Sequence, residues 1–467
     1  MTEPLWKLSA TELQRRYRER SLAPRAVVDA VLARIDAVDG RLGAVVARRD
    51  DAVRAEADAA TRRFAEGRPL SALDGIPLTL KDSLFSADGA TTCGTAALRD
   101  FHAGHDELAA ARARAGGALL VGKTNVPEFA NDGYTANPLF GATGNPWNPA
   151  LTPGGSSGGA VAAVAAGMAP LAIAQDGGGS IRRPASHTGL VGLKPSLSAW
   201  PREHALPGLL LDFDCIGPVA RTVADTRLLF DALRGPAAVD RSSLAAAWAA
   251  ARPRAPGPLR VLYVEHLNGN PLDREIAASC AGAVKTIAAL GHRVEAGALP
   301  LDVSFVMDAW PQIGQVGLAA MFDQHPDWEA QASPKYREAA ALGRQVSGAR
   351  VWQIMERVRR LRRESVAMFE RHDVVVMPAA AALPWPKEVA FPSVIDGREV
   401  GPRGHAAYTG WVNAAGLPGL ALPAAPSREG LPIGIQLIGP YGQDDLLLDL
   451  GAAYEAAAPW AHRWPAL

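Results

Sequence analysis

One lysine and two serines lie in stretches of sequence whose composition suits acyl transfer. Lys81 is in "DGIPLTLKD", Ser156 is in "PGGSSGG" and Ser180 is in "QDGGGSIRRPAS". A serine hydroxyl becomes a good nucleophile only when a base takes its proton, and an uncharged lysine can be that base. At an ordinary pKa of about 10.4, only about one lysine in 2,500 is neutral at pH 7. Burial lowers this pKa, and Lys81 ends an apolar run, so we expect Lys81 to be buried rather than exposed and paired with Asp82.

Two other interpretations of the glycine-rich stretches fit less well. A phosphate cradle would need GxxxxGK[ST] or GxGxxG, and neither pattern is present. Residues 154–158 match GxSxG, the nucleophile elbow of α/β-hydrolases, but an elbow follows a strand. The preceding "NPWNPALTP" is too rich in proline for a central strand, although the ten histidines leave a histidine base available.

Several ordered motifs, together with Lys81, Ser156 and Ser180, resemble the amidase signature family of Ser–cisSer–Lys hydrolases. The resemblance runs from about residue 73 to 225 and resumes near the C-terminus. The motifs are "GKTNVPEF", "NPLFGATGNPWNP", "PGGSSGGAVAAVAAG", "DGGGSIRRPA", "GLVGLKP", "DCIGPVARTVAD" and "GLPIGIQLIGP". The resemblance implies that Ser180 is the nucleophile, that Ser156 follows a cis peptide bond and relays the proton, and that Lys81 is the base.

The three glycines before Ser180 suggest where a developing oxyanion would bind. Gly177, Gly178 and Gly179 carry no side chain, so their N–H groups and that of Ser180 are accessible donors for an amide carbonyl oxygen. We expect Asp176 and Arg182 to hold this loop rather than to react. By resemblance, Ala130 and Asn131 lie where the substrate channel begins.

The hydrophobic pattern predicts which elements carry these residues. Residues 9–66 predict two or three amphipathic helices, with Ser9 as an N-cap and Pro24 in a first turn. Strands are expected at 76–80, at "GGALLVG" ending at Gly122, at 171–175, at 258–265 and at "DVVVMPA", and a hairpin at "GLALPAAP" with "PIGIQLIGP". Two helices are expected on either side of Ser347, and a short one before Gly167.

These elements predict an α/β fold, and the resemblance implies a single α/β/α domain with a large mixed sheet covered by helices. We divide the chain into N-terminal helices at 1–70 and an amidase signature domain at 71–467. Within it, residues 299–400 are the least regular part and are predicted to shape the substrate site. We expect four tryptophans to pack in the core, and the alternative is that they line an aromatic pocket. They are Trp310, Trp352, Trp385 and Trp411.

Composition limits the setting and the partners. The formal net charge is +0, which argues against nucleic-acid or membrane-surface binding. The N-terminus lacks an apolar secretory segment, so we expect a cytoplasmic protein. The three cysteines are far apart, so we expect buried packing rather than disulfides or a metal site. No cofactor is expected; the expected partner is a small-molecule amide, and a homodimer is considered.

We therefore expect an amidase that hydrolyses a linear carbon–nitrogen bond through an ester on Ser180. One alternative is a glutamine-hydrolysing amidotransferase of the A type, and another is a binding protein with an inactive core. The triple glycine resembles the nylon-oligomer and aryl-amide hydrolase branches more than the amidotransferase branch. After "GLVGLKP" the common T-x-G-R pattern is replaced by "SLSAWPREHALPG", a loop that we expect to border the active site.

Overall fold

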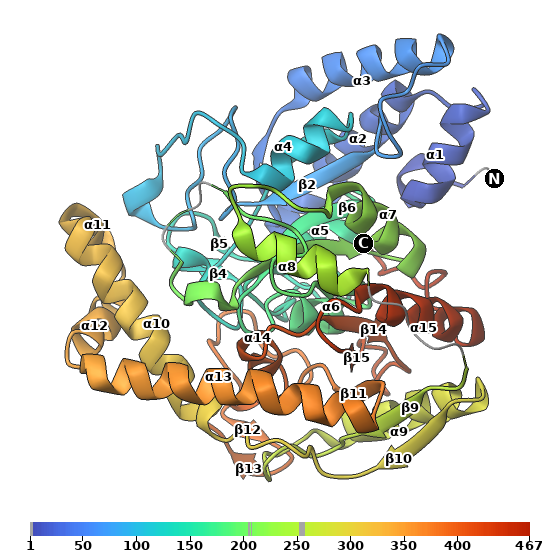
Figure 1. The fold of residues 1–467 in the computed structure, drawn as a ribbon. Coiled ribbons are helices and arrows are strands. Elements are labelled where there is room, and N and C mark those ends of the chain that lie inside the picture. The colour runs from blue at the N-terminus through green and yellow to red at the C-terminus, as the bar shows by residue number, and fades with distance from the viewer. Residues whose placement is uncertain (1–2, 204–205, 207, 252–256) are drawn as a thin grey trace.

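A mixed sheet of eleven strands forms the centre of the molecule in the computed structural model, which describes residues 3–203, 206, 208–251 and 257–467. The strand order is β1-β3-β2-β6-β8-β7-β14-β15-β11-β9-β10. Parallel pairs occur on both flanks, and the middle from β6 to β11 is antiparallel. Figure 1 shows that the two flanks lie at opposite ends of the molecule, with α1–α3 beside one flank and α9 beside the other.

The strands are mostly short and buried, as expected of a sheet that is covered on both faces. Their bounds are β1 Val45–Arg48, β2 Pro77–Lys81, β3 Leu119–Thr124, β6 Leu171–Asp176, β7 Val191–Lys194, β8 Cys215–Ala220, β9 Arg260–Tyr263, β10 Arg293–Ala296, β11 Val374–Pro378, β14 Gly419–Pro423 and β15 Gly434–Ile438. Two small hairpins stand apart from the sheet: β4 Ala136–Asn137 with β5 Gly141–Ala142, and β12 Val394–Ile395 with β13 Arg398–Glu399.

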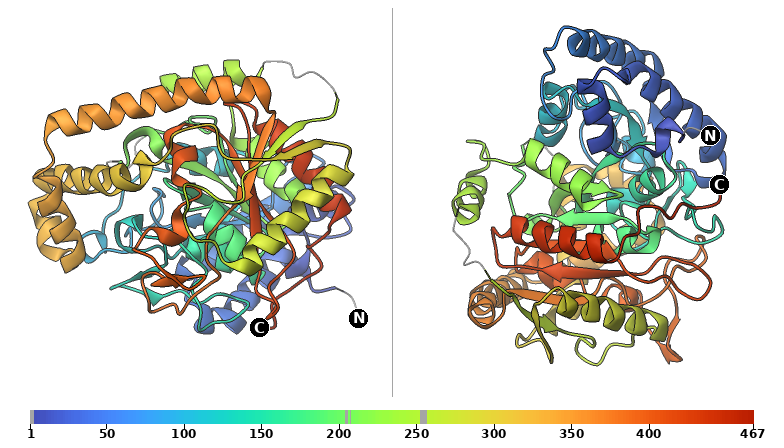
Figure 2. Two further views of the ribbon diagram at one scale, coloured as in Figure 1. Left: turned by 90° about the horizontal axis from the view of Figure 1, so that it is seen from below. Right: turned by 90° about the vertical axis from the view of Figure 1, so that its right-hand side faces the viewer.

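Helices cover both faces of the sheet, as Figure 2 shows. Side chains alternate along a strand, and β14 illustrates the result. Leu420 lies against Gly451 of α15, whereas the next residue, Ala421, belongs to the apolar cluster that includes Ile181 and Ala185 near α6. The chain is therefore a three-layer α/β/α domain with a large mixed sheet, as expected.

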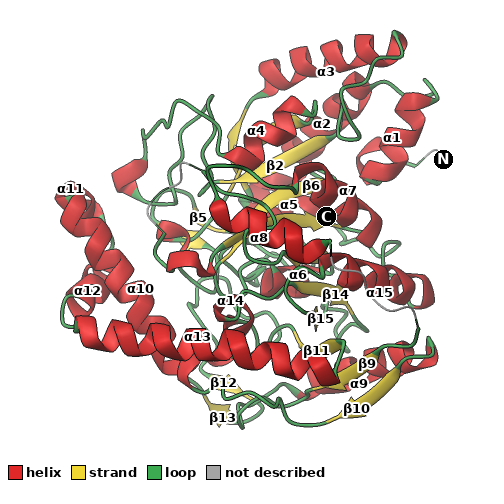
Figure 3. Cartoon of the chain, in the orientation of Figure 1, coloured by secondary structure: helices red, strands yellow, loops and turns green. Residues whose placement is uncertain are grey.

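The helices begin and end largely where local signals predict. Ser9 caps α1 by accepting the Glu12 N–H, Pro24 opens α2, and Ser347 caps α13. The bounds are α1 Ala10–Arg18, α2 Pro24–Leu42, α3 Asp50–Ala65, α4 Leu108–Ala115, α5 Gly158–Ala165, α6 Arg182–Thr188, α7 Val223–Leu233, α8 Arg241–Ala250, α9 Arg274–Ala289, α10 Phe305–Gln324, α11 Pro326–Gln331, α12 Pro334–Gly343, α13 Gly348–Arg371, α14 Gly410–Ala414 and α15 Asp444–Ala457. Long connections, green in Figure 3, gather between α4 and α10.

Three features of the structure were not expected from the sequence. The N-terminal segment contains a strand, β1, which pairs antiparallel with β3. Strand β3 does not end at Gly122 but continues to Thr124. Gly122 allows β1 to approach, because a Cβ at Gly122 would lie 2.1 Å from the Ala47 carbonyl oxygen. In residues 299–400 the two helices expected on either side of Ser347 are present as α12 and α13, but the long helix α10 was not expected.

Two further features concern the described residues only. All three cysteines are buried and free, as expected: Cys93, Cys215 and Cys280. Among the helices of the described part of the chain, none is long and apolar enough to cross a membrane.

Candidate active site

The sheet brings the three chemistry-bearing segments to one edge. Strands β2 and β6 are parallel neighbours, with Leu80 opposite Ile173, so their carboxyl ends meet. Lys81 is the last residue of β2, and Ser180 lies in the turn that follows β6. Ser156 precedes α5, and the N–H of the adjacent Ser157 donates to the Ser180 carbonyl oxygen at 3.3 Å.

Lys81 is buried, with 1% of its surface exposed. Its Nζ donates to Ser156 Oγ at 2.7 Å and lies 3.3 Å from the Gln175 carbonyl oxygen. Burial lowers the Lys81 pKa to about 8, while the carboxylates of Asp214 and Asp176 act in the opposite direction. The alternative of a surface lysine paired with Asp82 is excluded, because Asp82 instead lies 3.5 Å from Lys123 Nζ.

The two serines differ in exposure. Ser156 is 2% exposed, whereas Ser180 is 9% exposed and reaches the cavity described below. The Gly155–Ser156 peptide bond is cis. The side chain of the neighbouring Ser157 donates to the Gln175 carbonyl oxygen at 3.0 Å. Of the two adjacent serines, only Ser156 therefore contacts Lys81.

The glycine loop is held from behind by the Asp176 carboxylate. It accepts the N–H groups of Gly179, at 2.6 Å, and Ile181, at 3.1 Å, and pairs with Arg182 Nε at 3.0 Å. Burial acts to raise the Asp176 pKa, but the Arg182 guanidinium outweighs it and holds the pKa well below its ordinary value. Asn413 Nδ2 also donates to Asp176, so this carboxylate accepts hydrogen bonds from both the loop and α14.

The glycine N–H groups do not all point the same way, so the expectation that all three glycines are oxyanion donors is wrong for one of them. Gly179 is not an accessible donor, because its N–H is taken by Asp176. Within the described residues, the N–H groups of Gly177, Gly178 and Ser180 have no acceptor. Gly179 instead needs to be glycine, with φ of 115° and space for a Cβ occupied by Thr409.

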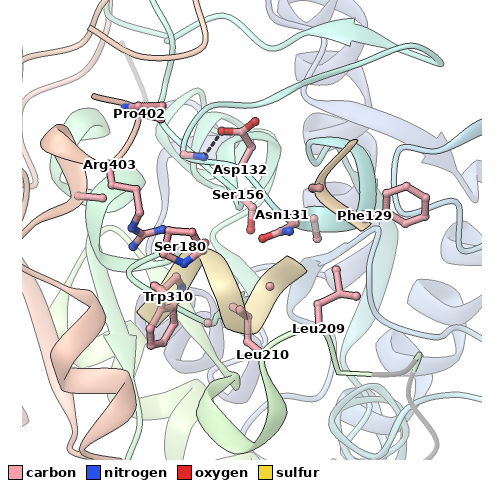
Figure 4. A pocket seen from close by; sticks show the side chains of 18 of the residues that line it. Phe129, Asn131, Asp132, Ser156, Ser180, Leu209, Leu210, Trp310, Pro402 and Arg403 are labelled. Atoms are coloured by element: carbon pink, nitrogen blue, oxygen red, sulfur yellow. Dashed lines mark hydrogen bonds between the residues drawn. The ribbon is translucent and has the colours of Figure 1, made fainter. Parts of the chain in front are cut away.

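A cavity of about 1000 Å³ opens in front of these residues (Figure 4). Its walls include Lys81, Ser156 and Ser180, together with Gly177, Gly178, Ala130 and Asn131. The structure thus brings these predicted site residues together, while Gly179, Asp176 and Arg182 lie behind the wall.

Helix α10 and the loop at 196–208 also contribute to the cavity. Trp310 lines it, Trp385 and Trp411 are buried, and Trp352 is exposed. In the loop that departs from the family pattern, Arg202, Leu206 and Gly208 line the cavity, as expected; positions 204, 205 and 207 lie outside the described residues.

A chain of polar side chains, most of which line the cavity, was missed from the sequence. Ser83 Oγ donates to Gln175 Oε1 at 2.6 Å, and Gln175 Nε2 donates to Asp214. Asp214 accepts from Arg202 at 2.7 Å, and Arg202 in turn pairs with Glu107 at 2.9 Å. Gln175, Asp214 and Arg202 all lie within the sequence motifs given above, and these positions could have drawn attention to the chain.

The comparisons with known proteins decide the family. The Amidase family model matches residues 26–448, most of the chain. The chain belongs to the amidase signature family. Over the whole chain it is 33% identical to an acylamidase of Rhodococcus erythropolis, across 99% of that protein. It is also 32% identical to the A-type polypeptide of a glutamyl-tRNA(Gln) amidotransferase from a Picosynechococcus species, over 94% of this chain and 96% of that one.

Solved amidase structures have the same fold over nearly the whole length. A bacterial aryl acylamidase of the amidase signature family superposes with a TM-score of 0.89 at 28% identity, covering 98% of each chain. A 6-aminohexanoate cyclic dimer hydrolase gives 0.87 at 30% identity, covering 99% of each. As an amidase signature protein, the chain is a hydrolase acting on amide C–N bonds.

Proposed function

We propose that this amidase hydrolyses a linear amide through an ester on Ser180, with Ser156 as proton relay and Lys81 as base. One observation carries the proposal: the buried Lys81 Nζ lies 2.7 Å from Ser156 Oγ at the base of a cavity that Ser180 also lines. Burial lowers the Lys81 pKa to about 8, so that about a tenth of the molecules hold the neutral amine at pH 7.

The chemistry proceeds in two acyl transfers. Neutral Lys81 takes the proton of Ser156, which takes that of Ser180 while Ser180 Oγ attacks the amide carbonyl carbon. The N–H groups of Gly177, Gly178 and Ser180 are the proposed donors to the oxyanion, each worth about 3 kcal/mol of transition-state stabilisation when well placed. The proton returns through Ser156 to the leaving amine, the C–N bond breaks, and water then hydrolyses the ester by the same relay.

The walls of the cavity suggest where substrate binds. Ala130 and Asn131 are the proposed contacts at its entrance, and Asn131 lies beside Ser156 in Figure 4. Phe129, Leu209 and Leu210 supply apolar surface near them. An apolar acyl or amine group next to the scissile bond fits this wall.

Labelling with a fluorophosphonate tests the nucleophile directly. We expect one adduct per chain, located by mass spectrometry on the peptide that contains Ser180, and amide hydrolysis that disappears in Ser180→Ala. A folded Ser180→Ala protein that retains near-wild-type turnover would refute the mechanism. Absence of both labelling and hydrolysis in the wild type would favour the alternative of an inactive binding protein.

A second candidate is a glutamine-hydrolysing amidotransferase of the A type, favoured by the 32% identity to such a polypeptide. It requires release of ammonia from glutamine and partner chains that co-purify. The isolated chain is assayed for ammonia release from glutamine and from hexanamide and for aniline release from acetanilide, and the relative rates separate the two candidates. Preference for glutamine would support the amidotransferase function.

A further inference from the structure

One cationic side chain of the cavity wall, Arg403, lies close to the glycine loop. Its guanidinium lies over the Trp310 ring, 5.9 Å from the ring centre. The same ring packs on Gly178, where a Cβ would lie 3.1 Å from Trp310 Nε1. Arg403 is therefore only one indole ring away from a proposed oxyanion donor, and Figure 4 shows it beside Ser180.

Arg403 is the exception among the cations of this cavity. Arg183 donates to the Gly178 carbonyl oxygen at 2.6 Å, Arg202 pairs with Asp214, and Lys335 pairs with Asp132 at 2.8 Å. Arg403 has no ion pair and no side-chain hydrogen bond within the described residues, and its Nε is buried without a partner.

The Asp132 carboxylate does not neutralise this guanidinium. Asp132 acts on Arg403 electrostatically but is bound to Lys335. Burial lowers the Arg403 pKa to about 10, so the side chain still carries its charge at neutral pH. A partly desolvated cation without a counterion is costly, and the planar guanidinium suits two parallel hydrogen bonds to a carboxylate.

Apolar side chains lie across the cavity from Arg403. In Figure 4, Arg403 and Trp310 lie to one side of Ser180, whereas Phe129 and Leu209 lie to the other side. Phe129 belongs to an apolar cluster with Phe322. The cavity therefore offers a cation on one side of the nucleophile and apolar surface on the other.

We propose that the substrates are amides that carry a carboxylate on one side of the scissile bond and an apolar group on the other, and that Arg403 binds the carboxylate. This inference rests on the proposed function, because it takes Ser180 as the position of the reacting carbonyl. Arg403 acts as a specificity-determining residue and takes no part in the proton relay.

Two matched substrate pairs test the proposal in the full-length protein. The first compares N-phenylacetylglycine with N-propyl phenylacetamide, which places the charge on the amine side. The second compares glutaric acid monoanilide with pentananilide, which places it on the acyl side. In at least one pair we expect the wild type to show a tenfold or greater preference in kcat/KM for the anionic member.

The arginine variants separate a binding role from a structural one. Arg403→Gln is expected to reduce the preference at least tenfold, mainly through KM, and Arg403→Lys to retain part of it. The matched control is Arg360→Gln, which removes an equal charge from an exposed position on α13 and should change the ratio less than twofold.

The outcomes distinguish failure of this inference from failure of the proposed function. A wild type that labels at Ser180 and hydrolyses the neutral amides, but prefers neither anionic member, overturns the role of Arg403 and leaves the proposed function intact. A preference for the anionic substrate that persists in Arg403→Gln also overturns the role of Arg403. A wild type that neither labels at Ser180 nor hydrolyses any of the substrates refutes both proposals.

Discussion

Lys81 Nζ and Ser156 Oγ lie 2.7 Å apart although 75 residues separate them in the chain. Lys81 is placed by the end of β2, and Ser156 by the turn that leads into α5, a helix packed against β2 and β6. Both side chains are removed from water, so the amine loses much of the hydration that favours its charged form. This contact is the basis of the first two predictions.

The pH dependence should report the titration of Lys81. The Lys81 pKa is lowered to about 8, and the base works only when deprotonated. With a neutral amide as substrate, kcat/KM should therefore rise about tenfold per pH unit below pH 7 and level off above about pH 9. Stopped assays of pentananilide hydrolysis from pH 6 to 10 measure this, and a flat profile would contradict a lysine base.

The hydroxyl of Ser156 should matter more than that of its neighbour. Ser156→Ala removes the group between Lys81 and Ser180, and we expect kcat to fall by about 10²–10⁴-fold. Ser157→Ala removes a hydroxyl that contacts the Gln175 carbonyl oxygen instead, so its loss should be at least tenfold smaller. Equal losses in the two variants, measured by steady-state kinetics, would argue against a relay through Ser156.

Asp176 should contribute strongly to stability. Asp176→Ala removes the acceptor of several loop N–H groups and leaves the Arg182 guanidinium, which is 0% exposed, without its carboxylate. We expect the free energy of unfolding in urea to fall by about 3–5 kcal/mol. The control Arg344→Ala breaks exposed ion pairs and should cost less than about 1 kcal/mol. A comparable loss in both variants would contradict the role of Asp176.

Gly179 should not tolerate a side chain. In Gly179→Ala, the new Cβ would lie 2.2 Å from Thr409 Oγ1, and φ of 115° disfavours alanine. We expect the loop to shift and kcat to fall at least a hundredfold. Gly282→Ala, on the open surface of α9, has nothing within 4 Å of its Cβ and should stabilise the protein by up to about 1 kcal/mol. Thermal unfolding and kcat are measured for both variants, and a Gly179→Ala enzyme with near-wild-type activity would refute the prediction.

Local signals accounted for most elements of the fold. The Ser9 and Ser347 caps, Pro24 and the alternation before Lys81 act through neighbouring residues, so they are readable from the sequence. Strand β1 was missed because it is four residues long and half-exposed, and its pairing with β3 depends on a distant glycine, Gly122. Helix α10 was missed because Pro311 interrupts its pattern.

The sequence by itself determined the family, the fold class and the set of residues available for chemistry, because residue types and ordered motifs need no three-dimensional information. Tertiary structure alone decided which of those groups meet. It buried Lys81 beside Ser156 and gave the Gly179 N–H to Asp176. Among the described residues, it also left the buried Arg403 Nε without a hydrogen-bond partner. The physical reason is that hydrogen bonds and desolvation depend on distances between segments far apart in the chain, which packing of the sheet and helices sets.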